Sequence, residues 1–520
     1  MLLSRIARAR PCRAPPTPLF CKHTGGPKSF SAKHSFPHRS SRSKSNPIKY
    51  TAITAGLLSS TGLWWLVTSS PANSVPNLSP QTQQHPSTKS SPGLSEDQVT
   101  AILSKDAYSY LVRNIPSVDR YDGAQIASNS PCEDTFLHGR FPSPLDDARS
   151  GSNSNRWMAW GVFDGHLGRQ TADVLQRELV GYVWRRLNAL QLSTDQGKGS
   201  ELEDEVVQQA ITRGFVDLDE KIFSTAMAAA AASSTEESLA EKVEKMMPAF
   251  AGSCALLSLF NPRTSTLHVA CTGDSRAVLA QQNPDGSWTM SPLSTDQTGS
   301  NEDEISRVNA EHPNEPAIVR NGRVLGLMVS RAFGDGQWKW PAKVQKELEK
   351  RFHGPGLLNS KYEVRTPPYI TAEPVVTSTK IEAGRAAFVI LATDGLWDFM
   401  RSEQAVQLVG GWLDAQVTGR TVVGRVAPAF NEPFDFAHLD KEGVPWGFTE
   451  GRTTIQDSNA AVHLMRNALG GSHHELIAGR LAFEPPHSRR VRDDTTVQVV
   501  FFNMGSLAGG ANGGRDGDRK

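Results

Sequence analysis

The chain has 520 residues, 38% of them hydrophobic, so it can fill a large core, and a small fold held by disulfides is excluded. The formal net charge of +1 gives no indication of a nucleic-acid partner. Five scattered cysteines without a CxxC pair exclude a disulfide framework and the usual zinc motifs, and they favour a reducing compartment: Cys12, Cys21, Cys132, Cys254 and Cys271.

The N-terminal region has the composition of a targeting segment. No Asp or Glu precedes Glu96, whereas basic residues recur through residues 1–47, which predicts a mitochondrial targeting segment; a plain basic tail is the alternative. Residues 48–68 are uncharged after Lys49 and contain two tryptophans near one end, as a transmembrane segment would; a cleaved sorting signal or an isolated apolar patch would look similar. We therefore expect association with the inner membrane, with the matrix and the intermembrane space both open as the side of the folded region.

A linker, one folded domain and a tail follow. Residues 69–94 are rich in Pro, Ser and Gln without apolar periodicity, and they predict a disordered tether. The domain is expected to span residues 95–503 and to open with a helix, because Ser95 and Gln98 are spaced as a capping box. Residues 504–520, glycine-rich from Gly509, predict a disordered tail.

Helical and strand patterns alternate through the domain. Apolar residues from Ala172 to Leu187 recur at helical spacing. Residues 226–248, which begin with an alanine run, are expected to be a helical or flexible insertion without chemistry. Residues 253–260 and 266–271 are expected to form a hairpin. The remaining expected elements are helices that begin near residue 300 and at 402 and 457, and strands over 388–392 and 495–502. His463, on the last of these helices, is expected to be a core or surface histidine rather than a ligand.

Acidic residues mark the ends of these apolar strands. An aromatic run ends in Asp164-Gly165-His166, and a second apolar run ends in Asp394, whereas Asp493 precedes its strand. Antiparallel strands would therefore bring the three carboxylates to one rim. Asp274 also follows an apolar strand, and the adjacent pair Glu133 and Asp134, which taken alone is typical of a solvated loop, lies in a proline-containing turn.

Clustered carboxylates need positive charge, and no Lys or Arg accompanies all three strand ends. Oxygen ligands without a Cys or His pair favour magnesium or manganese over zinc. Two such ions sharing one carboxylate would activate a water for in-line attack on phosphorus. A phosphate-binding GxxxxGKS/T loop is absent, so the metals would have to bind the phosphoryl group. The pattern therefore predicts phosphate-ester hydrolysis.

The ordered set of motifs resembles the metal-dependent serine/threonine phosphatases of the PP2C family, over about residues 95–503. The motifs are Glu133-Asp134, VFDGH (162–166), TGDSR (272–276), LMVSRAFGD (327–335), ATDGLWD (392–398) and RDDTT (492–496). The resemblance implies an α+β fold, a four-layer αββα sandwich in which helices flank two antiparallel sheets.

The resemblance also implies roles for single residues. His166 would be the general acid that protonates the leaving serine or threonine oxygen, a role that suits a pKa near neutrality, although an ordinary turn histidine is the alternative. Two Mg²⁺ or Mn²⁺ ions, and a third in some members, would be held as follows: Asp164 bridges two ions, Gly165 ligates through its carbonyl, Asp394 and Asp493 complete one ion, Glu133 and Asp134 hold waters on the other, and Asp274 with Asp394 holds the third.

Four further stretches look most like mitochondrial pyruvate dehydrogenase phosphatases: residues 106–112, 310–313, 365–374 and 457–469. Many PP2C enzymes carry an arginine that grips phosphate where this chain has Asn129, and the resembling phosphatases lack it too. The expected substrate is therefore the pyruvate dehydrogenase complex, through its E1 alpha subunit. The alternatives are another phosphoprotein in the intermembrane space, or an inactive protein that binds phosphoproteins.

Overall fold

The computed structural model describes residues 93–142, 156–193, 202–233, 235–315, 318–358, 362, 364–419 and 446–508. The expected targeting segment, the expected membrane segment, nearly all of the linker and the tail from residue 509 lie outside these ranges. Within the described part of the chain, no helix combines the length and the apolar character that crossing a membrane requires.

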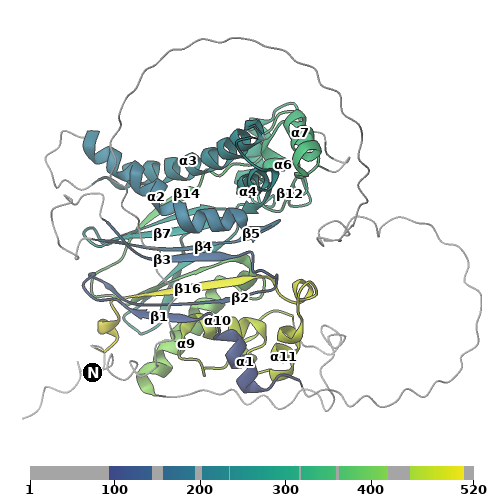
Figure 1. Ribbon diagram of the computed structural model, residues 1–520. Helices are drawn as coiled ribbons and strands as arrows, with labels where there is room; N and C mark the ends of the chain where they lie inside the picture. The colour runs from purple at the N-terminus through teal and green to yellow at the C-terminus, as the bar shows by residue number, and fades with distance from the viewer. Residues whose placement is uncertain are drawn as a thin grey trace, which may run out of the picture. The chain divides into compact units, whose positions relative to one another are not determined.

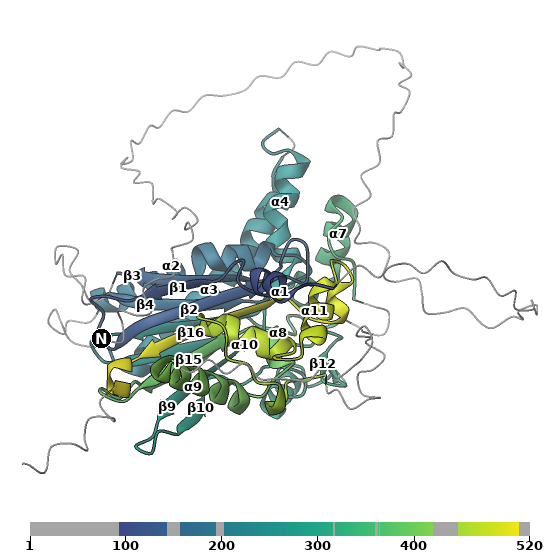
Figure 2. The same cartoon turned by 90° about the horizontal axis from the view of Figure 1, so that it is seen from below.

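Two antiparallel sheets lie face to face, and helices cover the outer face of each (Figures 1 and 2). The first sheet has the order β1 (Tyr108–Leu111), β2 (Val118–Ile126), β16 (Thr495–Phe502), β15 (Ala387–Ala392), β9 (Arg276–Gln282) and β10 (Trp288–Pro292). The second has the order β14 (Val375–Lys380), β8 (Thr266–Thr272), β7 (Ala255–Asn261), β4 (Trp157–Phe163) and β3 (Thr135–Phe141). The predicted α+β sandwich is confirmed.

Each layer of helices covers one sheet. The second sheet is covered by α2 (Gln170–Ser193), α3 (Asp204–Ala231) and α4 (Leu239–Phe250). The first is covered by α1 (Glu96–Leu103), α9 (Ser402–Thr418), α10 (Ala460–Leu469) and α11 (His474–Ala482). The layers follow from the alternation of side chains along a strand. In β4, Trp160 packs between the sheets, whereas Trp157 and Phe163 pack beneath α2 and α3.

Shorter elements cluster near one end of the sheets. A three-stranded sheet joins β13 (Phe333–Gly334), β6 (Gly252–Ser253) and β5 (Gly165–His166). A satellite core lies among the connecting segments and includes Val308, Val324, Trp338 and Tyr369. The other elements are α5 (Glu302–Glu311), β11 (Val319–Arg320), β12 (Arg323–Val324), α6 (Gly336–Lys339), α7 (Ala342–Phe352), α8 (Asp394–Trp397), and the 3-10 helices η5 (Glu450–Arg452), η6 (Ser488–Arg490) and η7 (Met504–Ala508).

The structure agrees with most of the expected elements and moves some boundaries. The capping box is confirmed, since Ser95 and Gln98 exchange hydrogen bonds of 2.8 and 3.3 Å. The hairpin is confirmed as β7 and β8. The last predicted helix begins at Ala460 rather than Asp457, because the Asn459 side chain caps it. Met504–Ala508 form η7, so order extends past residue 503, where the tail was expected to begin.

The alanine-rich stretch is part of the helical layer. Its first residues continue α3, and Ala226 and Ala230 are buried in the core beneath that helix. Residues 239–250 form α4, which begins with a second capping box at Ser238. The helical alternative of the expected helical or flexible stretch is therefore correct, and the structure adds that these helices belong to the packed layer over the second sheet.

Candidate metal centre

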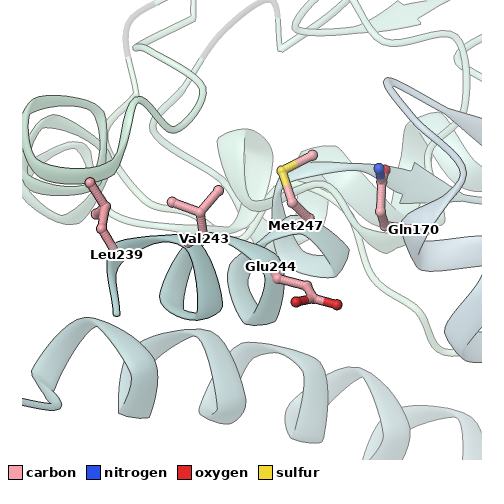
Figure 3. Close-up of a pocket in the computed structure, with 6 residues that line it drawn as sticks. Gln170, Leu239, Val243, Glu244 and Met247 are labelled. Carbon is pink, nitrogen blue, oxygen red and sulfur yellow. The ribbon is translucent and has the colours of Figure 1, made fainter. Parts of the chain in front are cut away.

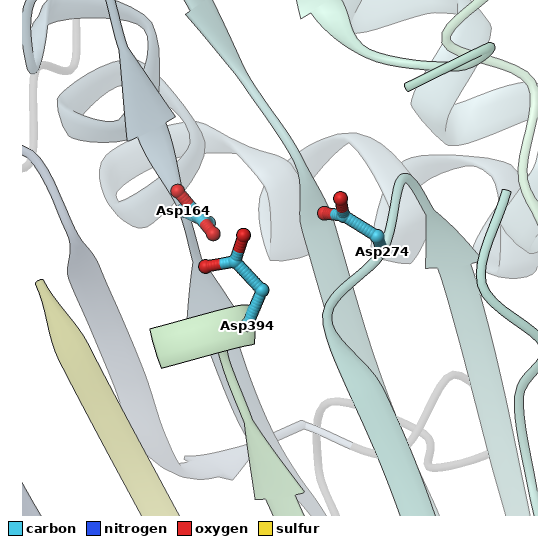
Figure 4. A group of neighbouring side chains, drawn as sticks. All are labelled: Asp164, Asp274 and Asp394. Carbon is cyan, nitrogen blue, oxygen red and sulfur yellow. The ribbon is translucent and has the colours of Figure 1, made fainter. Parts of the chain in front are cut away.

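Three carboxylates converge where strands of both sheets end. Asp164 follows β4, Asp274 follows β8, and Asp394 follows β15 as the first residue of α8. One oxygen of each lies within 4.8 Å of the others. Figure 4 shows Asp164 and Asp394 facing each other, with Asp274 reaching in from the loop beyond its strand. Asp164 and Asp394 therefore meet as the strand ends predict, but the third member of the group is Asp274 rather than Asp493, and the group draws on both sheets.

Asp493 and Asp494 precede β16 and have different surroundings. Asp494 is buried, and it accepts hydrogen bonds from Ser128, Asn129 and Glu133, so its oxygens organise the preceding loop. Asp493 is partly exposed, and its charge contributes to the raised pKa of both Asp164 and Asp394. Of the two acids, Asp493 is therefore the one whose charge acts on both Asp164 and Asp394.

The pair Glu133 and Asp134 lies just before β3. Asp134 accepts hydrogen bonds from the hydroxyls of Thr393, at 2.9 Å, and Thr496, at 2.8 Å, both on one carboxylate oxygen. Its other oxygen, Oδ1, is buried without a hydrogen-bond partner among the described residues. An oriented but unpartnered carboxylate oxygen is what a water or an ion would satisfy.

Close backbone approach explains why glycine follows Asp164. A Cβ at Gly165 would lie 2.3 Å from the carbonyl oxygen of Glu133, far inside van der Waals contact. Only glycine lets the two acidic segments meet at this point. Gly252 on β6 has the same role beside His166, since a Cβ there would lie 2.2 Å from the imidazole Nε2.

The cluster is electrostatically unfavourable without a cation. Burial raises the pKa of Asp164 well above its usual range, and Asp394, Asp134, Asp274 and Asp493 raise it further. Burial likewise raises the pKa of Asp394, and Asp274 is the next cause. The donors are carboxylate oxygens, which hard divalent cations prefer. The residues present therefore fit Mg²⁺ or Mn²⁺.

His166 is held by a buried carboxylate. Its Nε2 lies 2.7 Å from Oδ2 of Asp335, which is fully buried at the start of α6. Burial alone would lower the pKa of His166, but the charge and hydrogen bond of Asp335 outweigh it and raise that pKa. About a quarter of the His166 side chain stays exposed. An accessible imidazole whose charged form is favoured can donate a proton to a bound substrate.

Comparison with known proteins identifies the family. The family model for protein phosphatase 2C matches residues 128–426, more than half of the chain. The chain belongs to the protein phosphatase 2C family. The PP2C resemblance of its motifs is confirmed, and the chain is a protein serine/threonine phosphatase.

Three relatives cover most of this PP2C chain. A protein phosphatase 2C homologue of Schizosaccharomyces pombe is 39% identical over 89% of the chain and 97% of its own length. The mitochondrial pyruvate dehydrogenase (acetyl-transferring) phosphatase 1 of Saccharomyces cerevisiae is 35% identical, over 79% of the chain and 73% of its own length. The mitochondrial phosphatase of the same name from Homo sapiens is 29% identical, over 81% and 86%.

Two residues of the PP2C site escaped the sequence reasoning. Asp335 follows the Gly334 that ends a short strand, so its signal was the same as that of Asp164: an acid at the end of an apolar run. Asp494 was visible only as the neighbour of Asp493. Each acts through a partner distant in the chain, His166 or Asn129, and local patterns carry no information on such pairs.

A groove of about 810 Å³ lies over α4 rather than over the acids. Figure 3 shows Leu239, Val243 and Met247 on one face of α4, with Gln170 from the start of α2 at one end. The lining is mostly apolar, apart from Gln170 and Glu244. In this PP2C chain the groove is separate from the residues that can hold metal.

Proposed function

We propose that this protein is a mitochondrial pyruvate dehydrogenase phosphatase that hydrolyses phosphoserine or phosphothreonine at the acid cluster. The observation that carries the proposal is the convergence of Asp164, Asp274 and Asp394 within 4.8 Å. Relatives of 35% and 29% identity that carry this activity in their names support the substrate. Their names also support a mitochondrial location.

We propose the metal ligands that the resemblance to PP2C phosphatases implies, and the convergence of Asp164, Asp274 and Asp394 supports them. Asp164, Asp394 and Asp493, with the Gly165 carbonyl, would hold the ions directly, while Glu133 and Asp134 would hold their waters. Asp274 completes a further site beside Asp164 and Asp394. When bound, Mg²⁺ or Mn²⁺ supplies positive charge for the phosphoryl oxygens and makes a water nucleophilic near neutral pH.

The proton for the leaving group comes from His166. The serine or threonine alkoxide that departs from phosphorus is a poor leaving group unless it is protonated, and the partly exposed imidazole can reach it. Asp335 favours the charged form of His166 and fixes the ring through its 2.7 Å hydrogen bond. Asp335 is therefore a positioning residue.

The activity is tested by phosphate release from phosphorylated pyruvate dehydrogenase complex. Wild-type protein should release phosphate with Mg²⁺ or Mn²⁺, and EDTA or the substitution Asp164→Asn should abolish release. Glu347→Gln, which changes an exposed acid paired with Arg351 on α7, is the control and should keep full activity. Equal activity of wild type and Asp164→Asn would overturn the mechanism. Release from an unrelated phosphopeptide but not from the complex would overturn the substrate.

The N-terminal segments determine access to that substrate. We propose that residues 1–47 direct import and that residues 48–68 anchor the protein at the inner membrane, as their composition indicates. Carbonate extraction of mitochondria tests the anchor, which predicts recovery in the pellet. Protease added to mitoplasts tests the side: a protected phosphatase domain agrees with a matrix substrate, whereas degradation places the domain in the intermembrane space and excludes that complex.

A further inference from the structure

Arg489 is placed at the edge of the acid cluster. Its Nη1 lies 2.8 Å from Oδ1 of Asp493 and its Nη2 lies 2.9 Å from Oδ2, so one edge of the guanidinium spans the carboxylate. About half of the side chain is exposed. Its remaining N–H donors are therefore accessible from solvent next to a residue that faces the metal site.

The positive charge of Arg489 interacts with several acids of the cluster. Burial lowers its pKa, but Asp493, Asp494, Glu133 and Asp164 outweigh this and raise it. The guanidinium contacts Asp493 directly, and the charges of Asp494, Glu133 and Asp164 act on it.

Neighbouring donors are already engaged. Arg169 is paired with Asp173 at 3.0 Å, and Arg276 is paired with Asp296 at 2.6 Å. The Asn129 amide donates to Asp494 at 2.9 Å, so it faces the acids. Among these donors of the described chain, Arg489 combines proximity to the acids with an exposed edge.

The backbone of Arg489 is fixed against the loop of the first acid pair. The hydroxyl of Ser488 donates to the carbonyl of Ser128, and Arg492 donates to the carbonyl of Ala127 at 3.1 Å. Residues on both sides of Arg489 in the chain are therefore joined to residues 127–128, and Asp493 follows directly. This arrangement positions the guanidinium rather than leaving it on a free surface loop.

We propose that Arg489 binds the phosphoryl oxygens of the substrate and orients them toward the acid cluster. The proposal rests on the proposed phosphatase function. A phosphate dianion that approaches several carboxylates meets repulsion, and an arginine beside them offsets it while supplying N–H donors with a geometry suited to phosphate. Arg489 thereby supplies a cation that Asn129 cannot.

Kinetics of three variants test this role. Arg489→Ala should raise KM for a phosphopeptide and the inhibition constant of inorganic phosphate together, by about 10- to 100-fold, with kcat changed by less than about threefold. Arg489→Lys should recover part of the loss, because the charge remains but the planar fork does not. Arg490→Ala is the matched control: Arg490 is an exposed neighbour on η6 and should behave as wild type.

Two further measurements separate phosphate binding from support of Asp493. The Mn²⁺ concentration for half-maximal activity should be unchanged in Arg489→Ala; an increase that accounts for the higher KM would overturn the proposal. Fluorescence anisotropy measures the affinity of a labelled phosphopeptide for the His166→Ala protein in Mn²⁺. The double variant His166→Ala, Arg489→Ala should bind this peptide about 10-fold or more weakly than His166→Ala alone. Equal affinities would overturn it. If the wild-type protein had no phosphatase activity but the two variants still differed in affinity, the proposed function would be rejected and the role of Arg489 in phosphate binding would stand.

Discussion

At the scale of single residues, the site depends on partners that fix its functional groups. Asp335 orients His166, and the hydroxyls of Thr393 and Thr496 orient Asp134. These partners are buried, so their hydrogen bonds are strong and removing one leaves a polar group unsatisfied. The chemistry of the centre therefore depends on these positions as well as on the acids proposed to hold metal.

Asp335→Asn tests the positioning of His166. The variant should lower kcat on the order of 10- to 100-fold and change KM little, because the general acid acts in the chemical step. Since Asp335 raises the pKa of His166, its loss should move the alkaline limb of the kcat profile to lower pH. A pH profile with unchanged limbs would contradict the assigned role.

Asp164→Asn tests whether the acid cluster is an ion site. Without metal, the variant should melt at a higher temperature than wild type, because one charge of a repelling group is removed. Saturating Mn²⁺ should stabilise wild type, by about 2.7 kcal/mol at about a hundredfold excess over Kd, and not the variant. Thermal unfolding with and without Mn²⁺ measures both effects, and equal gains in the two proteins would contradict the site.

At the scale of elements, packing determined features that local patterns left open. The expected elements had correct types because apolar spacing and caps are local signals. The role of the alanine-rich stretch was not local. Ala226 and Ala230 are small because α3 packs closely against its neighbours there. Gly214, earlier in the same helix, lies in a similarly close contact, since a Cβ at this position would lie 2.8 Å from the Cα of Val183. Small residues in α3 thus mark tight contact rather than a flexible insertion.

The same substitution at two alanines tests this packing. Ala226→Leu should destabilise the protein by about 1–3 kcal/mol, because the side chain has to enter a filled core. Ala228→Leu, two residues along the same helix, is exposed and should change stability by less than about 0.5 kcal/mol. Urea unfolding measures both. Equal effects at the two positions would contradict a packed α3.

At the scale of the whole molecule, buried histidines link stability to pH. Burial lowers the pKa of His463 and of His268 to about 4. His463 donates from Nε2 to the Leu408 carbonyl at 3.1 Å, inside the core where α10 packs against α9, so it is a core histidine as expected. Both side chains are neutral in the folded state near neutral pH, whereas the unfolded chain protonates them near pH 6.5.

Acid should destabilise the folded protein through these two histidines. The stability tied to these histidines is complete above about pH 6.5 and is lost as the pH falls toward about 4. At pH 5, each of these histidines should lower the free energy of unfolding by about 2 kcal/mol. Urea unfolding of wild type and His463→Gln at both ends of this range measures the difference, and the variant should lose less stability in acid. Identical losses would contradict a buried, neutral His463.

The sequence alone determined the family, most elements and the acidic character of the centre, because acids at strand ends and periodic apolar residues are local features. It placed Asp164, Asp274 and Asp394 at the ends of apolar strands, and the structure brings these three together where strands of both sheets end. Only the tertiary structure joined His166 to Asp335, distinguished Asp493 from Asp494, and placed Arg489 beside the acids. These contacts depend on how distant segments pack, because hydrogen bonds and charge interactions act through space and not along the chain.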